Sequence, residues 1–233
     1  MSSSNNNVKN FYEIIPKDFL DNNPNPNYGK THLFNLPHRS VAIGSSGSGK
    51  TNWLCNYLER LCSGKGSYAH IYIICKDNSE PLYKYLATLS DSIMVKEGLN
   101  HLPKLDDIDK SVNTLVIIDD MVLDKDQSRV EKYYMMCRKK NVSIIYLSES
   151  YYRVPKFIRV NANELILIKV PSERDLKLIL SESAMGIDKN VLLKMYNDIT
   201  KEKFNALIID FNAAPEKRYI HNFMEIIDID KYK

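Results

Sequence analysis

The sequence predicts an α/β fold with a mostly parallel central sheet and helices on both of its faces. Apolar runs of strand length alternate along the chain with segments of helical periodicity, as in proteins built from strand–helix–strand units. The most apolar of these runs are continuous, which is typical of strands that are buried on both faces of a parallel sheet. The 233 residues are enough for a substantial core, and the 44% hydrophobic and 26% charged content is that of a soluble globular protein.

The expected elements follow one another in an order that suits parallel pairing. Strands are expected at 40–44, 70–75, 92–95, 114–119, 143–148 and 164–170. Helices are expected at 50–62, 80–89, 126–140, 173–185 and 188–199. Two later apolar segments, 205–211 and 218–221, are expected to extend the sheet, and the acidic tail from 225 to 230 is expected to be only marginally ordered.

Composition divides the chain into two parts. Residues 1–30 are rich in Asn, Ser and Pro, and the segment 21–27 cannot hold a helix or an interior strand, so this part is predicted to be a partly disordered extension. Short apolar segments within it, 11–15 and 19–20, are able to dock on the same subunit or on a neighbour. Residues 31–233 are predicted to be a single domain.

Other features of the sequence point away from membrane, secreted and metal-scaffold proteins. No apolar run approaches the ~20 residues of a membrane span, and the N-terminus lacks the apolar core of a signal peptide. The five histidines have no ligand spacing and are expected to be structural. The four cysteines match neither a zinc site nor a disulfide framework, so we expect buried, small apolar residues in a reducing compartment at Cys55, Cys62, Cys75 and Cys137.

Residues 44–51 match the P-loop pattern G-x-x-x-x-G-K-[ST] in full. They follow an apolar run and open the expected helix 50–62, which is the context that the motif requires. Backbone N–H groups of such a loop bind phosphate oxygens, Lys50 supplies charge to the β- and γ-phosphates, and the Thr51 hydroxyl can ligate Mg²⁺. The chain is therefore predicted to bind a nucleoside triphosphate through Gly44, Ser45, Ser46, Gly47, Ser48, Gly49, Lys50 and Thr51.

Two further apolar runs end in polar groups, at the edge where an open α/β sheet binds its ligands. The run 114–118 ends in Asp119, which would hold Mg²⁺, and in Asp120. Asp120 lies where P-loop motors of the additional-strand type carry the carboxylate that polarises the attacking water. The run 142–147 leads into Glu149, where a polar group can contact the γ-phosphate. The alternative in each case is an ordinary junction between a strand and a loop.

The order of these motifs, together with the segment from Cys137 to Leu180, resembles the FtsK/HerA superfamily. Within it, the chain is most similar to the genome-packaging ATPases of large DNA viruses and their virophages, from about residue 38 to about residue 185. The Pro-x-x-Ile-Arg element of that family is matched by the segment from Pro155 to Arg159. Glu149 departs from the family, which has a sensor glutamine at this position. The resemblance implies a RecA-like P-loop ATPase domain.

The resemblance also implies a function. It is that of a motor that uses ATP and Mg²⁺ to package viral double-stranded DNA into a capsid, as a homo-oligomeric ring. Lys50 would neutralise phosphate charge and Asp120 would orient water, while an arginine would come from the neighbouring subunit. For Glu149, which departs from the family, there are two alternatives: a helper of Asp120, which is the hypothesis we hold, or an impaired sensor that slows the motor. Arg159 is favoured for that role and Arg138 is second. Capsid or portal vertex proteins are further expected partners, and the expected location is the host cytoplasm or viral factory, or the virion.

The charge of the chain supports nucleic-acid binding only weakly, since its net value is +3. Basic residues do gather locally with aromatic ones, an arrangement that can grip a phosphate backbone but is also common on solvated surfaces. These residues are Arg138, Lys139, Lys140, Tyr151, Tyr152, Arg153, Lys156 and Arg159. In a ring, a modest charge on each subunit would be multiplied around a common channel.

Two other functional classes stay open at this point. A P-loop kinase would need an arginine-rich lid over the acceptor, and the segment after residue 148 has scattered arginines without a clear lid. A nucleotide-gated assembly or scaffold protein without significant turnover is compatible with the missing sensor glutamine. ATP turnover measured with and without double-stranded DNA separates these classes from a packaging motor.

Overall fold

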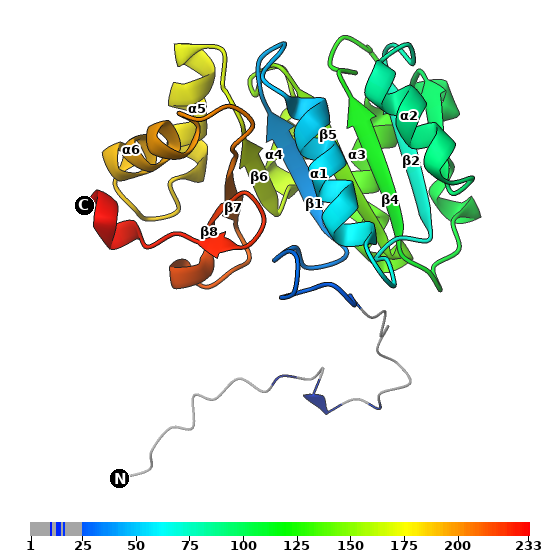
Figure 1. Ribbon diagram of the computed structural model, residues 1–233, viewed down its shortest axis with the longest axis horizontal. Coiled ribbons are helices and arrows are strands. Elements are labelled where there is room, and N and C mark those ends of the chain that lie inside the picture. The colour runs from blue at the N-terminus through cyan, green and yellow to red at the C-terminus, as the bar shows by residue number, and fades with distance from the viewer. Residues whose placement is uncertain (1–9, 11–12, 15, 17–24) are drawn as a thin grey trace.

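The computed structural model describes residues 10, 13–14, 16 and 25–233, and within them nine strands form one sheet (Figure 1). The sheet order is β3-β2-β4-β5-β1-β6-β7-β8-β9. The strands from β3 to β6 in this order pair in parallel, and β7, β8 and β9 add antiparallel pairs. The predicted α/β class is thus confirmed. The bounds are β1 (Arg39–Ile43), β2 (His70–Cys75), β3 (Ile93–Glu97), β4 (Thr114–Asp119), β5 (Val142–Ser148), β6 (Glu164–Leu167), β7 (Leu207–Asp210), β8 (Tyr219–His221) and β9 (Glu225–Ile226).

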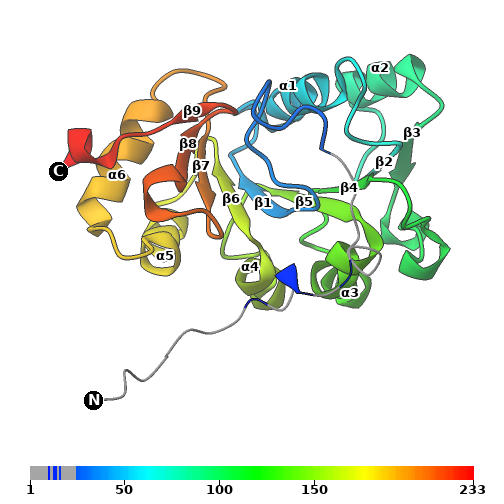
Figure 2. The same cartoon turned by 90° about the horizontal axis from the view of Figure 1, so that it is seen from below.

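Helices cover both faces of the sheet (Figures 1 and 2). Two of them, α1 (Lys50–Cys62) and α2 (Pro81–Leu89), lie on one face. The opposite face is covered by α3 (Ser128–Met136), α4 (Lys156–Asn161), α5 (Glu173–Ser183) and α6 (Lys189–Ile199). Short 3₁₀ helices are η3 (Leu99–His101), η4 (Leu105–Asp107), η5 (Cys137–Lys140), η6 (Pro215–Lys217) and η7 (Ile229–Tyr232).

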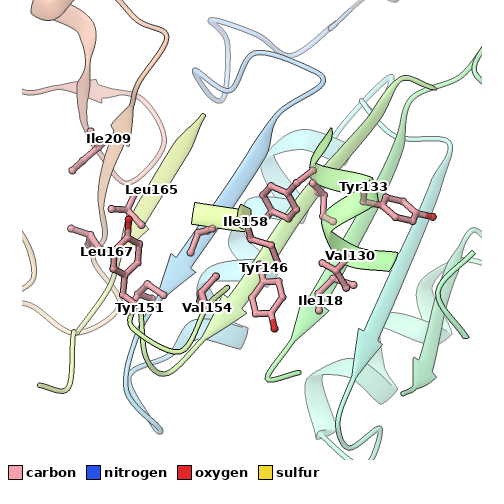
Figure 3. Close-up of a cluster of buried hydrophobic side chains, with 14 of the residues drawn as sticks. Ile118, Val130, Tyr133, Tyr146, Tyr151, Val154, Ile158, Leu165, Leu167 and Ile209 are labelled. Carbon is pink, nitrogen blue, oxygen red and sulfur yellow. The ribbon is translucent and has the colours of Figure 1, made fainter. Parts of the chain in front are cut away.

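Strand alternation divides the interior into two cores, because successive side chains of a strand point to opposite faces. Val41 and Ile43 of β1 belong to the core beneath α3 to α6, whereas Ala42 belongs to the core beneath α1 and α2. Figure 3 shows part of the first core, where Val130 of α3 and Ile158 of α4 lie over the sheet. Both faces of the central strands are therefore buried beneath helices, as their continuous apolar sequences predict.

An aromatic cluster fixes α1, the helix that follows the P-loop. The Trp53 ring stacks on Tyr57 and on Phe223, with 5.6 Å between centroids in each pair. Phe34 packs against Trp53 and Tyr57 from the segment before β1. Rings of this kind bury ~150–250 Å² each, so the start of α1 is held firmly against the sheet.

A buried polar network joins the start of β1 to α1 and β6. His38 Nδ1 lies 2.7 Å from Ser40 Oγ, and His38 Nε2 lies 2.5 Å from the Tyr57 hydroxyl. Ser40 Oγ donates to Glu164 Oε2 at 2.6 Å. Burial lowers the pKa of His38 to about 3 and raises the pKa of Glu164 to about 8. Both groups are therefore uncharged near neutral pH, and His38 has the structural role expected of it.

The observed elements differ from the prediction in three places. The helix expected at 126–140 is α3 followed by η5, because the helix tightens before Asn141, which has a left-handed φ of 52°. The strand expected at 164–170 ends at Leu167, because the carbonyl of Lys169 accepts instead from the P-loop N–H of Ser45 at 2.7 Å. The short helix α4 was not predicted, since its six residues are too few to show a helical period.

Both ends of the described chain are more ordered than the sequence suggests. The tail forms β9 and η7, where the Tyr232 hydroxyl donates to Asp198 Oδ2 at 2.8 Å. Buried Asn27 donates to the carbonyl of Leu61 at 2.8 Å, so the packed region begins before the expected boundary at residue 31. The expected disorder and docking before residue 25 fall on residues of which only 10, 13–14 and 16 are described.

The cysteine prediction is half correct. Cys75 and Cys137 are buried, while Cys55 and Cys62 are only partly buried. In the described part of the chain, no helix is both long enough and apolar enough to cross a membrane.

Candidate active site

The P-loop connects β1 to α1 at the carboxyl edge of the sheet, at the top of Figure 1. It is held by both neighbouring strands. The N–H of Gly44 donates to the carbonyl of Ser148 at the end of β5 at 3.1 Å, and the N–H of Ser45 donates to the carbonyl of Lys169 after β6 at 2.7 Å. The loop is therefore a fixed cradle, built where open parallel sheets bind their ligands.

The start of α1 presents unpaired N–H groups to this cradle. Its N-cap is Gly49, which has a left-handed φ of 94° and no side chain to cap the helix. Lys50 Nζ donates to the carbonyls of Gly44 at 2.9 Å and Ser45 at 3.3 Å, so its ammonium lies over the loop. A helix N-terminus with a cation beside it is a site for an anion such as a phosphate.

Asp119, at the end of β4, is connected to the P-loop helix by a tyrosine. The Tyr83 hydroxyl of α2 donates to Asp119 Oδ2 at 2.6 Å and lies close to the Thr51 side chain. Burial raises the pKa of Asp119 above its usual range, although Tyr83 and Lys50 favour the charged form. The structure thus brings the two predicted metal ligands, Thr51 and Asp119, to one hydroxyl group. Both supply oxygen atoms, which are the ligands that Mg²⁺ prefers.

Asp120 and Glu149 are also brought to this edge. β5 lies between β4 and β1 in the sheet, so the loop that follows it faces both the acidic pair and the P-loop. Glu149 Oε1 lies 3.9 Å from Lys50 Nζ, and its side chain is 49% exposed. Asp120 has a left-handed φ of 55°, and its N–H donates to the carbonyl of Leu147 at 3.1 Å. Both carboxylates line a cavity of about 370 Å³ together with Lys50, Thr51 and Asp119.

Sequence reasoning missed Glu80, which lines this cavity, and Tyr83, whose hydroxyl binds Asp119. Glu80 is the N-cap of α2 and lines the cavity beside Asp119 and Asp120. The Pro81 that follows it marks the start of a helix, but nothing local indicates that this helix faces the P-loop. With Glu80 included, four carboxylates face one lysine, so the cavity is acidic around the phosphate cradle.

Arg159, the predicted trans arginine, is engaged within its own chain. Its Nη1 donates to the carbonyls of Tyr151 at 3.2 Å, Tyr152 at 3.2 Å and Val154 at 3.1 Å. Its Nε lies 3.4 Å from Glu182 Oε2 of α5, and only 9% of the side chain is exposed. These contacts pin the loop that follows β5 and Glu149. A role in a neighbouring active site would require Arg159 to leave all of them.

The other arginines lie at opposite ends of β5. Arg138 is exposed in η5, which precedes β5, and so lies at the amino edge, away from its own P-loop. Arg153 is exposed in the loop that follows β5, at the edge of the P-loop. The expected basic and aromatic cluster is therefore divided between two edges, and Tyr151 within it is buried at 4% exposure.

Comparisons with known proteins agree with this geometry. A model of the Poxvirus A32 protein family matches residues 26–221. The genome packaging NTPase B204 from Sulfolobus turreted icosahedral virus 2, in complex with ATPγS, has a TM-score of 0.57 at 16% identity, over 77% of this chain and 95% of that chain. The DNA-packaging ATPase B204 from Sulfolobus Turreted Icosahedral Virus gives 0.57 at 19% identity over the same shares. EssC (ATPases 2 and 3) from Geobacillus thermodenitrificans gives 0.54 at 12% identity, over 82% of this chain and 40% of that chain.

At these identities the similarity establishes the fold, which is that of the P-loop ATPases. No curated protein sequence matches the chain.

Proposed function

Because the chain belongs to the Poxvirus A32 protein family, we propose that it is an ATP-hydrolysing motor that packages viral double-stranded DNA into a capsid. The family match bears out the resemblance to viral packaging ATPases, and the chain has the fold of a P-loop ATPase together with the full P-loop sequence pattern. The observation that carries the proposal is the cavity in which Lys50, Thr51, Asp119, Asp120 and Glu149 meet.

Charge explains how this cavity would accept a triphosphate. Asp119, Asp120, Glu149 and Glu80 would repel a bare triphosphate, and Lys50 alone does not compensate for them. Thr51 and Asp119 would hold Mg²⁺, which when bound supplies the positive charge that the phosphate oxygens need. Tyr83 helps to hold the side chains of Thr51 and Asp119 near each other, since its hydroxyl lies close to both.

Hydrolysis would then depend on positioning and electrostatics rather than on covalent chemistry. The N–H groups at the start of α1 and Lys50 would hold the β- and γ-phosphates. Asp120 would orient the attacking water, and Glu149, at the end of the neighbouring strand, would assist it. Tyr151, Tyr152 and Val154 accept hydrogen bonds from Arg159, so this arginine positions the loop that carries Glu149.

Assembly into a ring belongs to the same proposal. A net charge of +3 is small for a protein that binds DNA alone, but a ring would repeat it around a channel. One lysine faces four carboxylates in the acidic cavity, so a cation from the next subunit would complement its charge. Arg138 and Arg153 are exposed, whereas Arg159 is not. Further proposed partners are capsid or portal vertex proteins, and the proposed place of action is the host cytoplasm, the viral factory or the virion.

The decisive experiment measures steady-state ATP turnover with and without double-stranded DNA, alongside the mass in solution with an ATP analogue. We expect DNA to stimulate turnover and the analogue to favour a ring. Lys50→Ala is the control, and it should abolish turnover and sharply weaken nucleotide binding.

Turnover of this variant above about a tenth of the parent would place the active site elsewhere. Tight ATP binding without turnover by the parent would instead support a nucleotide-gated scaffold.

A further inference from the structure

A second cavity lies on the other side of the P-loop and has no part in the chemistry described above. Its volume is about 350 Å³, within the range of small-molecule sites. It is lined by the P-loop residues 45–48, by residues 168–169 after β6, and by the loop 200–205 that precedes β7. The acidic cavity faces β4 and β5, whereas this one faces β6 and β7. The two cavities share Ser46 and Gly47, so one ligand can occupy both.

Phe204 is the aromatic side chain of this second cavity. Its ring lies directly against the end of the P-loop, because a Cβ atom at Gly49 would stand 2.3 Å from Phe204 Cδ1. The side chain is nevertheless 44% exposed, and Lys203 Nζ lies 5.0 Å from the ring centroid. Phe204 also has a φ of 74°, a conformation that bulky residues rarely adopt and that is concentrated at binding sites.

We propose that this cavity is the nucleobase subsite and that Phe204 is the platform on which the base stacks. The inference rests on the proposed function, since it names the part of the site that holds the nucleoside. The γ-phosphate end of a bound triphosphate belongs beside Lys50, with Asp119 and Asp120. The nucleoside end then leaves the cradle on the opposite side, where an aromatic ring beside the P-loop offers a flat apolar surface.

The polar side chains of the loop indicate how selective this subsite is. The Thr200 hydroxyl donates to the carbonyl of Tyr196 at 2.8 Å, and Asn205 Oδ1 accepts from Asn222 at 3.0 Å. Both groups are thus engaged by the protein. The other polar side chains of the loop that line the cavity, Lys201, Glu202 and Lys203, are charged and exposed, so stacking is expected to be the main contact with an uncharged base. Stacking tolerates different bases because each has a π-face. ATP and GTP should therefore bind with affinities within about tenfold of each other, both tighter than CTP because a purine covers more of the ring.

The test compares a nucleotide with its phosphate chain alone on the full-length protein. Dissociation constants are measured by calorimetry for MgATP, MgGTP, MgCTP and magnesium tripolyphosphate. Phe204→Leu keeps apolar bulk but loses the π-face, and it should weaken ATP and GTP by roughly 5- to 150-fold. Tripolyphosphate binding should not change. Phe204→Tyr should behave like the parent, and so should Tyr85→Ala, which removes an exposed aromatic ring from α2.

A spectroscopic variant keeps the proposal testable if the leucine variant folds poorly. Phe204→Trp adds an exposed indole to a chain whose one native tryptophan, Trp53, is 1% exposed. ATP should quench the new fluorescence and tripolyphosphate should not. The proposal is overturned if Phe204→Leu weakens ATP and tripolyphosphate equally or weakens neither, or if both ligands quench Phe204→Trp equally.

These outcomes are distinct from those that bear on the motor. A parent protein that binds ATP but does not hydrolyse it contradicts the proposed function and leaves the stacking measurements intact. A parent protein that binds tripolyphosphate as tightly as ATP contradicts the base subsite alone.

Discussion

Replacing Arg159 by alanine should destabilise the protein within a single subunit. The substitution removes the donor for three backbone carbonyls, those of Tyr151, Tyr152 and Val154, and breaks the ion pair with Glu182. It also removes a cation that lies 5.1 Å from the centroid of the buried Tyr151 ring. The loop between β5 and α4 would then lose the contacts that fix its shape.

The size of the effect follows from burial. Breaking a buried ion pair by removing one partner costs ~3–5 kcal/mol, and hydrogen bonds to charged groups contribute ~1.5–3 kcal/mol each. The three carbonyls share one nitrogen, and Glu182 is 33% exposed, so water screens part of the loss. We therefore expect the free energy of unfolding to fall by about 3 kcal/mol. For a chain of this size such a loss lowers Tm by roughly 6–12 °C.

Urea unfolding followed by circular dichroism measures this change, and ATP turnover is recorded on the same samples. Arg153→Ala is the matched control, because Arg153 is exposed in the same loop, and it should change stability by less than ~0.5 kcal/mol. Arg159→Lys should recover little, since a lysine cannot reproduce the planar set of donors.

The opposite outcome is equally well defined. Arg159→Ala could unfold like the parent, lose turnover, and regain it when mixed with Lys50→Ala subunits. Such complementation would show that the guanidinium acts across a subunit interface and would refute the structural role. If Arg138→Ala or Arg153→Ala behaves in this way instead, that arginine is the donor.

Three more predictions concern the carboxylates. Asp120→Asn should reduce DNA-stimulated turnover far more than Glu149→Gln does, and Glu149→Ala should reduce it more than Glu149→Gln; a Glu149→Gln variant faster than the parent would contradict the helper role. Asp119→Asn should lose turnover mainly through loss of Mg²⁺, so a magnesium titration should restore part of it, and no recovery at any concentration would argue for another role. Burial raises the pKa of Glu164 to about 8, so the folded protein keeps a proton that the unfolded chain has lost, and the contribution of Glu164 to stability falls as pH rises from about 4.5 to about 8. Buried His38 contributes the opposite slope below about pH 6.5, because its pKa is lowered to about 3, so the fall should be visible between about pH 6.5 and 8. Glu164→Gln should remove that fall in urea unfolding, whereas an unchanged slope would mean that Glu164 is charged in the folded protein.

The sequence was most informative where one local pattern decides a structure. The strands at 70–75 and 114–119 have the predicted bounds, because continuous aliphatic runs suit only a buried strand there. The P-loop and the helix at 50–62 also coincide with the prediction, because the motif itself fixes where α1 begins. Asp119, Asp120 and Glu149 were found for a similar reason, since the carboxyl ends of parallel strands meet at one edge.

Residues that reach the site through tertiary packing could not be found in this way. Glu80 caps α2 and Tyr83 lies on it, and their approach to Asp119 depends on how that helix crosses the sheet. The contacts of Arg159 within its own chain could not be predicted for the same reason, because its acceptors in the loop 151–154 come close only when the chain folds back. Sequence spacing identifies an arginine near a strand end without showing whether its donors are already engaged.

Phe204 has a backbone conformation that its residue type does not predict, because a positive φ is rare for a bulky side chain. A phenylalanine with a φ of 74° is strained, so other contacts must hold it in place. One such contact is with Gly49, whose own φ of 94° and lack of a Cβ atom let the ring approach. The P-loop glycine and the loop before β7 therefore constrain each other. A ligand in the second cavity would contact both, because the P-loop and the loop 200–205 line it together.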